Sequence, residues 1–405
     1  MMTLSLYYWE SNCNSGMAKV LWYGDACCNT GFARVTHSVL DHLYKDHEVC
    51  VVGINATGDP HNHPYSVFPA GNINCPDRFG IARLPEILQK AKPDIVICCQ
   101  DIWVVNNVWE RIQFLQNDLK FKFLAYFPTD SEAYLPDMLR NMTAWDMCLT
   151  FTIPSANKIL ASGVKPRRFG VLPHGVDISK FSPGDKTQAR KNLGLPEDKF
   201  IVLNANRNQP RKRIDLTIEA FVEFSKGRPD TMLYLHMSAK DLGWDVIGMF
   251  RQAMTISGQD PENRLILTSQ NINYGDAPPD SLLENIYRAA DVGINTADGE
   301  GWGLVSFEHA ACKRPQIVGN HTACKDIWEK SAQLINVGTY VWDKDLTVKR
   351  GVIDTKHAAG LLRDLYEDRG LYEHTAEACY AVTQRPEYRW ENVAAGFNAA
   401  ILELV

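Results

Sequence analysis

The chain has 405 residues and a formal net charge of −6, with 45% hydrophobic and 22% charged residues. This length predicts two domains rather than one core. The balance of apolar and charged residues excludes a disordered chain, and no apolar run is long enough for a membrane helix. The negative charge disfavours general affinity for nucleic acid, and residues 1–16 lack the pattern of a signal peptide.

The chain contains eleven cysteines, and some lie in apolar runs. Cys98 and Cys99 in DIVICCQD are typical of reduced cysteine that packs as a small hydrophobe. We therefore expect a reducing compartment such as the cytoplasm, or the host cytoplasm if the chain is viral. The adjacent pairs Cys27-Cys28 and Cys98-Cys99 lack the spacing of zinc ligands, so a metal site is not expected. No cofactor is expected either.

The first part of the chain alternates strand-like and helix-like segments. Residues 1–16 are interpreted as an N-terminal extension, and AKVLWYGD after Met17 predicts a buried strand. Val35, Val39 and Leu43 recur at helical spacing in the segment that follows. Further strands are predicted at HEVCVVGIN, KPDIVICCQD, KFKFLAYFPTD and WDMCLTFT. This alternation is typical of βαβ units with a parallel sheet, here over residues 17–178.

The alternation pauses at LPHGVDISKFSPGD, which indicates a hinge near residue 180. A second series of strands is then predicted at KFIVLNANR, TMLYLHMSA, RLILTSQ and DVGINTAD, within a second domain over residues 179–383. Residues 384–405 predict a helix that crosses back to the first domain. The fold class is therefore α/β with two parallel-sheet domains, whose ligands should bind at the carboxyl ends of the strands, in a central cleft.

The segment INTADGEGWGLVSFEHAA passes from a strand through a glycine-rich turn into a helix predicted over residues 304–311. Amides at a helix start attract anions, and Gly301 and Gly303 allow close approach of a ligand. Glu300 lies in the turn and Glu308 two helical turns later. Taken singly, Glu300 is better explained as a surface turn residue and Glu308 as a solvated helix position. The combination of the two with glycines after a parallel strand favours a functional site.

The segment NANRNQPRKRIDLTIEAF also leads from a strand into a helix. Arg207 and Lys212 are close enough in sequence to converge on one diphosphate, whose charge grows as it departs. The alternative is a solvated basic loop, the usual fate of such clusters. Arg211 and Arg213 are interpreted as surface or secondary contacts.

Both segments resemble retaining glycosyltransferases of the two-domain GT-B fold, specifically glycosyltransferase family 4, with its E-x7-E signature and its Arg-x4-Lys pair. The resemblance implies two Rossmann-like domains, with the acceptor bound by the first and a nucleotide sugar by the second. It also implies that Glu300 contacts the donor sugar, that Glu308 binds the ribose, and that Arg207 and Lys212 bind the phosphates. Catalysis is then metal-independent, because basic side chains and helix dipoles replace the cation.

The resemblance extends to other donor-binding positions. Gly31, in the loop Asn29-Thr30-Gly31 before a helix, approaches the phosphates or the acceptor in that family, although a tight turn explains it equally well. Asn273 and Tyr274 lie where the family receives the base. The donor set is completed by Gly301, Trp302, Gly303 and Leu304.

The acceptor side has weaker signals. Asp130 follows the strand KFKFLAYF, where a carboxylate could orient the acceptor or touch the donor sugar; a helix cap is an equal alternative. Asp101 and Trp103 lie at another strand's carboxyl edge and are candidate acceptor contacts. His174 belongs to a PHGVD sequence that is structural in the family.

The predicted function is transfer of a hexose or related sugar from a UDP- or GDP-sugar to an acceptor hydroxyl, with Glu300, Asp130, Arg207 and Lys212 as catalytic residues. A glycan acceptor is favoured. A modified nucleic acid would need a local basic surface, for which Arg167, Arg168, Arg211 and Arg213 are the candidates. The alternatives are a sugar-nucleotide epimerase or hydrolase on the same fold, or an inactive nucleotide-sugar binding protein. Stable membrane insertion is not expected.

Overall fold

The computed structural model describes residues 5–6, 16–26, 28, 30–55, 62–71, 77–239, 241–268, 280–344, 346 and 348–405. The chain divides into two compact units. The first contains residues 1–129, 133–175 and 386–405, and the second contains residues 130–132 and 176–385. The division at residue 175 lies close to the predicted hinge, while the short stretch 130–132 belongs to the second unit.

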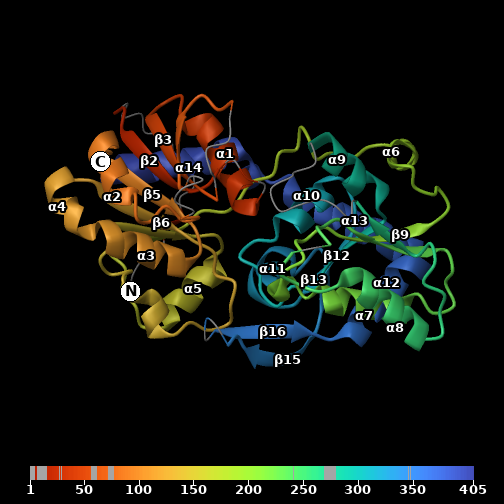
Figure 1. Ribbon diagram of the computed structural model, residues 1–405. Helices are drawn as coiled ribbons and strands as arrows, with labels where there is room; N and C mark the ends of the chain where they lie inside the picture. The colour runs from red at the N-terminus through yellow and green to blue at the C-terminus, as the bar shows by residue number, and fades with distance from the viewer. Residues whose placement is uncertain are drawn as a thin grey trace. The chain divides into compact units, whose positions relative to one another are not determined.

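The first unit is built on a parallel sheet with eight strands among the described residues, in the order β1-β8-β7-β6-β5-β2-β3-β4 (Figure 1). The strands are β1 Ser5–Leu6, β2 Lys19–Asp25, β3 Glu48–Ile54, β4 Ser66–Pro69, β5 Ile95–Cys99, β6 Lys122–Tyr126, β7 Met147–Thr150 and β8 Phe169–Val171. The helices are α1 Gly31–Leu43, α2 Leu84–Ala91, α3 Ile102–Ile112, α4 Gln116–Leu119, α5 Ile153–Ala161 and α14 Trp390–Leu404.

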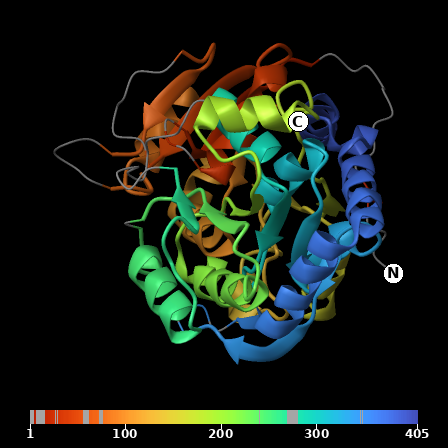
Figure 2. The same cartoon turned by 90° about the vertical axis from the view of Figure 1, so that its right-hand side faces the viewer.

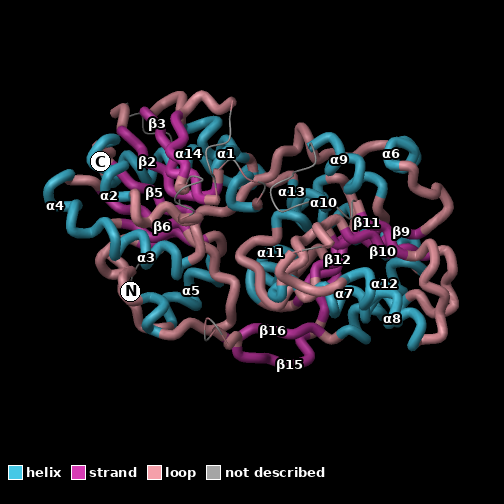
Figure 3. The backbone as a smooth tube through the Cα atoms, viewed as in Figure 1, coloured by secondary structure: helices cyan, strands magenta, loops and turns pink. Residues whose placement is uncertain are grey.

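Helices cover both faces of this sheet. Helices α1 and α14 pack together on one face, and α2, α3 and α5 lie on the other (Figure 3). The central strand β5 is buried along its whole length, as expected for a parallel strand covered on both sides. Helix α14 contributes Phe397, whose ring lies 5.2 Å from that of Trp22 in β2. The end of the chain therefore completes the core of the first unit.

The N-terminal segment makes a contact that the sequence did not indicate. Strand β1 pairs in parallel with β8, through Ser5 opposite Gly170 and Leu6 opposite Val171. Residues 1–16 were interpreted as an extension outside the domain. Two of these residues instead form an edge strand of the sheet. A strand of two residues is too short to show a periodic pattern in the sequence.

The second unit has a parallel sheet of six strands among the described residues, in the order β11-β10-β9-β12-β13-β14. The strands are β9 Phe200–Asn204, β10 Thr231–Leu235, β11 Leu265–Leu267, β12 Val292–Asn295, β13 Gln316–Gly319 and β14 Gln333–Ile335. The helices are α6 Lys186–Leu193, α7 Ile214–Phe224, α8 Val246–Ile256, α9 Asp280–Ala289, α10 Leu304–Ala311, α11 Thr322–Trp328, α12 Thr355–Glu367 and α13 Arg369–Thr383.

Helices α7, α8 and α12 cover one face of this sheet, and α9, α10 and α13 cover the other (Figure 3). An antiparallel hairpin, β15 Val337–Trp342 and β16 Lys349–Ile353, follows the last parallel strand (Figures 1 and 2). The hairpin was not predicted. Most of β15 is exposed on both faces, so its sequence lacks the alternation of apolar and polar residues that predicts a half-buried strand.

The expected α/β fold with two parallel-sheet domains is confirmed. The helix predicted to begin at Leu304 does so and spans Leu304–Ala311. None of the helices in the described ranges is both long and apolar enough to cross a bilayer.

Candidate functional site

Glu300 lies in the turn between β12 and α10, at the carboxyl edge of the second sheet. The turn ends at Gly303, which caps α10 with φ 90°, a left-handed conformation that glycine adopts without strain. The Glu300 side chain is buried, with only 5% of the residue exposed. The interpretation as a surface turn residue is therefore wrong.

Three side chains surround the Glu300 carboxylate. Lys212 donates to Oε1 over 2.5 Å, Asn295 donates to the same oxygen over 3.0 Å, and the Arg211 guanidinium lies 3.6 Å from Oε2. Burial would raise the pKa of Glu300, but the charges of Lys212 and Arg211 and the hydrogen bonds outweigh it and lower the pKa to about 2. Glu300 is therefore ionised and paired with two cations.

The two cations come from the loop between β9 and α7. This loop contains a 3₁₀ turn, Pro210–Lys212, and ends at Arg213, whose φ of 49° is left-handed. Arg211 also donates to the carbonyl of Gly299 over 2.5 Å. Arg211, expected to be a surface or secondary contact, instead lies beside the Glu300 carboxylate. Its position next to Lys212 in the sequence could have indicated this contact.

Arg207 is occupied elsewhere. Its guanidinium donates two hydrogen bonds to the Asp241 carboxylate, from Nε to Oδ2 over 3.1 Å and from Nη2 to Oδ1 over 3.2 Å. The structure thus brings Lys212 and Arg211 to one carboxylate and pairs Arg207 with another. Asp241 was not recognised in the sequence, where it lies in the loop after β10 without a motif.

Glu308 projects from α10 into the interior. It is 4% exposed, and its Oε2 accepts a hydrogen bond of 2.9 Å from the Tyr287 hydroxyl of α9. The alternative of a solvated helix position is therefore wrong. A buried glutamate two helical turns beyond Glu300 has the chemistry to bind hydroxyl groups.

The other residues expected to bind the donor follow Glu300 in the same turn. Gly301, Trp302 and Gly303 are buried, and Leu304 is half-buried as the first residue of α10. The Trp302 ring lies 5.2 Å from that of Phe307. The turn is therefore packed on α10 rather than loose.

A second charged cluster adjoins the turn. The Arg350 guanidinium of β16 lies 3.6 Å from Asp298, 3.5 Å from Asp130 and 3.0 Å from Asp343. Arg211 lies 3.7 Å from Asp130 and so joins the two clusters. Burial raises the pKa of Asp298 to about 6, against the opposing charges of Arg350 and Arg211.

Asp130 begins no helix, because the next helical turn is the 3₁₀ segment Pro136–Leu139. The helix-cap alternative is therefore wrong for Asp130. Its main-chain carbonyl lies so close to Gly299 that a Cβ there would be 1.8 Å from it. Asp298 and Arg350 were both missed, since nothing in the sequence places the hairpin beside this turn.

Gly31, Asp101 and Trp103 belong to the first unit. Gly31 is exposed at the first position of α1, after Thr30, whose hydroxyl caps the helix and donates to Asp25. Asp25, at the end of β2, also accepts from Gln100 over 3.1 Å, and this carboxylate was not recognised in the sequence. Asp101 is the N-terminal cap position of α3.

Trp103 lies in the first turn of α3, with its ring 5.5 Å from that of Phe79. Asn273 and Tyr274 lie outside the described residues. Within the described ranges, no group of three or more His, Cys, Asp or Glu side chains is arranged to hold a metal ion.

The arginines considered for a nucleic-acid surface are each paired with a carboxylate. Arg167 lies 3.6 Å from Asp146, and Arg168 lies 2.9 Å from Glu403. In the second unit, Arg213 lies 2.7 Å from Asp215, and Arg211 pairs as described above.

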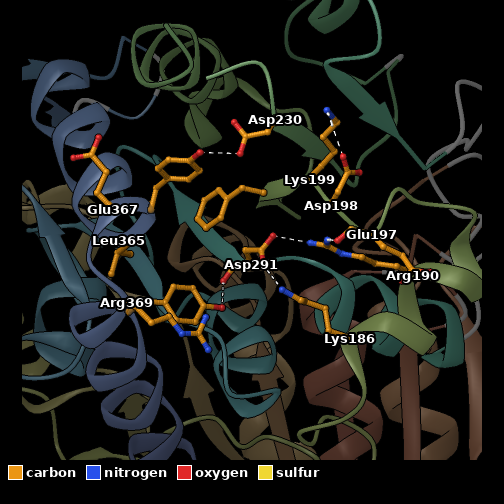
Figure 4. Close-up of a pocket in the computed structure, with 13 residues that line it drawn as sticks. Lys186, Arg190, Glu197, Asp198, Lys199, Asp230, Asp291, Leu365, Glu367 and Arg369 are labelled. Atoms are coloured by element: carbon orange, nitrogen blue, oxygen red, sulfur yellow. Dashed lines mark hydrogen bonds and ion pairs between the residues drawn. The ribbon is translucent and has the colours of Figure 1, made fainter. Parts of the chain in front are cut away.

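A cavity of about 310 Å³ lies at the opposite, amino edge of the second sheet (Figure 4). At its base, Asp291 accepts from Arg190 over 2.7 Å, from Lys186 over 2.8 Å and from the Ile201 amide over 2.7 Å. Arg190 also donates to three main-chain carbonyls, those of Ala289, Pro196 and Glu197. Asp291, Lys186 and Arg190 are thus paired with one another and with the main chain at this edge.

Curated relatives named D-inositol 3-phosphate glycosyltransferase match part of the chain. The protein from Geodermatophilus obscurus is 34% identical over 174 residues, which are 40% of this chain and 36% of that protein. The D-inositol 3-phosphate glycosyltransferase 2 of Catenulispora acidiphila is 29% identical over 234 residues, 55% of this chain and 49% of that protein. The chain thus matches about a third to a half of these relatives' length. No family model matches the sequence.

Solved structures resemble the chain over nearly its whole length. Sucrose-phosphate synthase from Thermosynechococcus elongatus has a TM-score of 0.72 at 15% identity and covers 95% of this chain and 98% of its own. HepE from Anabaena, solved with UDP and glucose, has a TM-score of 0.68 at 16% identity with the same coverage. The chain therefore has the two-domain GT-B fold of these solved structures, and part of it matches curated glycosyltransferases.

Proposed function

We propose that this protein is a metal-independent, retaining glycosyltransferase of family 4. It transfers a hexose or related sugar from a nucleotide diphosphate sugar to an acceptor hydroxyl. The observation that supports this most is the buried cluster of Glu300, Lys212 and Arg211 at the carboxyl edge of the second sheet. Parallel sheets bind ligands at this edge, and two cations there are suited to a diphosphate.

The leaving group determines the role of the cations. Breaking the bond between sugar and diphosphate leaves negative charge on the nucleotide, and fixed cations in a buried site stabilise that charge strongly. Lys212 and Arg211 are preorganised for this by Glu300, and the amides at the start of α10 add a second positive pole. Arg207 reaches the same diphosphate if it exchanges Asp241 for phosphate.

The two glutamates act on the neutral parts of the donor in this proposal. Glu300 is ionised and buried, so it accepts hydrogen bonds from sugar hydroxyls and orients the ring. Glu308 accepts hydrogen bonds from the ribose hydroxyls beside Tyr287. The departing phosphate takes the acceptor proton, so no separate general base is needed. Asp130, through Arg211 and Arg350, belongs to the same charge network.

UDP-glucose is the donor that we propose to test first. HepE was solved with UDP-glucose, and the Burkholderia vietnamiensis trehalose-phosphate synthase, with a TM-score of 0.67 at 14% identity, is described as UDP-forming. The curated relatives are named glycosyltransferases, which disfavours an epimerase, a hydrolase or an inactive binding protein. A glycan acceptor, or a phosphorylated polyol such as the inositol phosphate in those relatives' names, is preferred to a nucleic acid.

The compartment that we propose is a reducing one. The described cysteines Cys98, Cys99 and Cys148 are buried and free, as in proteins that remain reduced.

The test measures UDP release from UDP-glucose and GDP release from GDP-mannose, with and without glycan or inositol phosphate acceptors. Retention is read from the anomeric proton of the isolated product by NMR. We expect acceptor-dependent release that Lys212→Met abolishes. An inverted product would disprove retention, and release unaffected by Lys212→Met would disprove the assigned donor site.

A further inference from the structure

Thr322, the first residue of α11, has an unusual backbone conformation. Its φ is 48°, in the left-handed region. A β-branched side chain crowds its own backbone there, so a threonine in this conformation is a genuine outlier. The residue is buried, with 2% exposed. Glycine would adopt the same conformation without strain, so the threonine side chain must compensate for the cost.

The contacts of Thr322 converge on the main chain of Glu300. The Glu300 amide donates to the Thr322 hydroxyl over 3.0 Å. The next residue, Ala323, donates its amide to the Glu300 carbonyl over 3.2 Å. Two consecutive residues therefore satisfy both main-chain polar groups of Glu300.

The left-handed conformation makes this double contact possible. It turns the chain at the start of α11 so that the Thr322 hydroxyl and the Ala323 amide both face the Glu300 peptide. The Thr322 amide itself donates to the Glu132 carboxylate over 3.1 Å. The hydroxyl also lies 3.3 Å from Nδ1 of His321, to which it can donate while accepting from Glu300.

We propose that Thr322 is a positioning residue that fixes the Glu300 main chain, so that the Glu300 carboxylate stays directed at Lys212 and at the donor sugar. This inference rests on the proposed function for its catalytic part. The hydroxyl performs the positioning, and the strained backbone is the condition under which the hydroxyl reaches Glu300. A purely structural role would require only a residue that tolerates the left-handed conformation, and glycine would serve best.

Three substitutions separate these roles. Thr322→Ser keeps the hydroxyl, Thr322→Val keeps the β-branched shape without the hydroxyl, and Thr322→Gly removes both the hydroxyl and the strain. Asn263→Gly is the matched control, because Asn263 is an exposed residue of the same unit with φ 55°. It relieves a left-handed backbone away from Glu300.

The first measurement is hydrogen exchange at the Glu300 amide, which requires no substrate. We expect exchange at least tenfold faster in Thr322→Val and Thr322→Gly than in the wild type, with Thr322→Ser and Asn263→Gly close to the wild type. Unchanged exchange in Thr322→Val would overturn the contact itself, whether or not the protein turns over a donor.

The second measurement is UDP release from UDP-glucose. We expect kcat to fall at least tenfold in Thr322→Val and Thr322→Gly with little change in KM, and to recover to within about threefold in Thr322→Ser. The melting temperature of Thr322→Gly should stay near or above that of the wild type, so loss of folding would not explain the loss of kcat. If Thr322→Gly keeps the wild-type kcat, Thr322 has only a structural role.

The two proposals fail in different ways. A wild-type protein that releases no nucleotide from any donor contradicts the proposed function, and the exchange measurement then decides alone whether Thr322 fixes Glu300. An active wild type with unaffected Thr322 variants contradicts only the positioning role.

Discussion

The two edges of the second sheet each bury one carboxylate beside a lysine and an arginine, but the two arrangements differ in kind. At the amino edge, Asp291 is bound by Arg190, Lys186 and a main-chain amide, and Arg190 also donates to three main-chain carbonyls. At the carboxyl edge, Glu300 lies in a glycine-rich turn between residues with left-handed backbones. Similar ion pairs therefore stabilise the fold at one edge, and we propose that they prepare a donor site at the other.

The difference lies in what the cations do besides pairing. The other N–H groups of Arg190 donate to main-chain carbonyls at the ends of neighbouring elements, so removing Arg190 disrupts the packing of those elements. Lys212 donates to Glu300 in a turn that other contacts already fix, so removing it leaves that turn in place. Strained residues persist where the surrounding structure enforces them, and they concentrate at functional sites.

The largest effect expected is on stability at the amino edge. Arg190→Met leaves Asp291 buried with only Lys186 as a cation, and we expect a loss of about 3–5 kcal/mol in the free energy of unfolding. Urea denaturation measures it. Lys186→Met is the control, because the Lys186 side chain is 40% exposed and should cost much less. Equal losses in both variants would remove the distinction between the two cations.

The next effect is on activity at the carboxyl edge. We expect Lys212→Met to lower kcat/KM for UDP-glucose by about 10²–10³, the usual loss when one stabilising group is removed from a developing anion. The double variant Lys212→Met/Glu300→Gln, which removes both charges, should keep the wild-type melting temperature and remain inactive. An active double variant would show that the pair at Glu300 is structural, like that at Asp291.

A smaller effect concerns pH. The pKa of Asp298 is about 6 in the folded protein, mainly because of burial, and near 3.9 when unfolded. The folded protein therefore binds this proton more tightly, and the Asp298 contribution to stability falls as pH rises from about 4 to about 6. Relative to Asp298→Asn, the wild type should lose at most about 3 kcal/mol across this window. Equal changes in stability in the wild type and in Asp298→Asn across this window would contradict this prediction.

The smallest effect is at Glu308. Tyr287→Phe removes the hydroxyl that donates to the Glu308 carboxylate, and we expect a loss of about 1 kcal/mol in the free energy of unfolding. Because Glu308 is assigned to the ribose, KM for UDP-glucose should rise while kcat changes little. A change in kcat alone would contradict the ribose assignment.

The sequence predicted the parts of this site that depend on local pattern. The strand, turn and helix around Glu300 follow from periodicity and glycines, and the rule that ligands bind at the carboxyl ends of parallel strands predicts the Glu300 and Lys212 loops at one edge. Their direct contact was not predicted. The roles assigned to these residues remain predictions. The resemblance to a known family supplied those roles; the spacing alone did not.

The residues that the sequence did not reveal depend on long-range packing. Arg350 reaches Asp298 only because the β15–β16 hairpin is anchored beside the turn, and the sequence of the hairpin has no motif. The left-handed backbone of Thr322 is likewise invisible, because propensity disfavours it at threonine. Such features arise from tertiary contacts that no local pattern encodes.

Helix α14 has a consequence for the order of folding. The first unit contains residues 386–405, and Phe397 packs against both Trp22 and Tyr126. During synthesis the ribosome therefore makes the whole second unit before the first can close its core. The nascent first unit exposes the faces of Trp22 and Tyr126 in the meantime and should depend on chaperones over that interval.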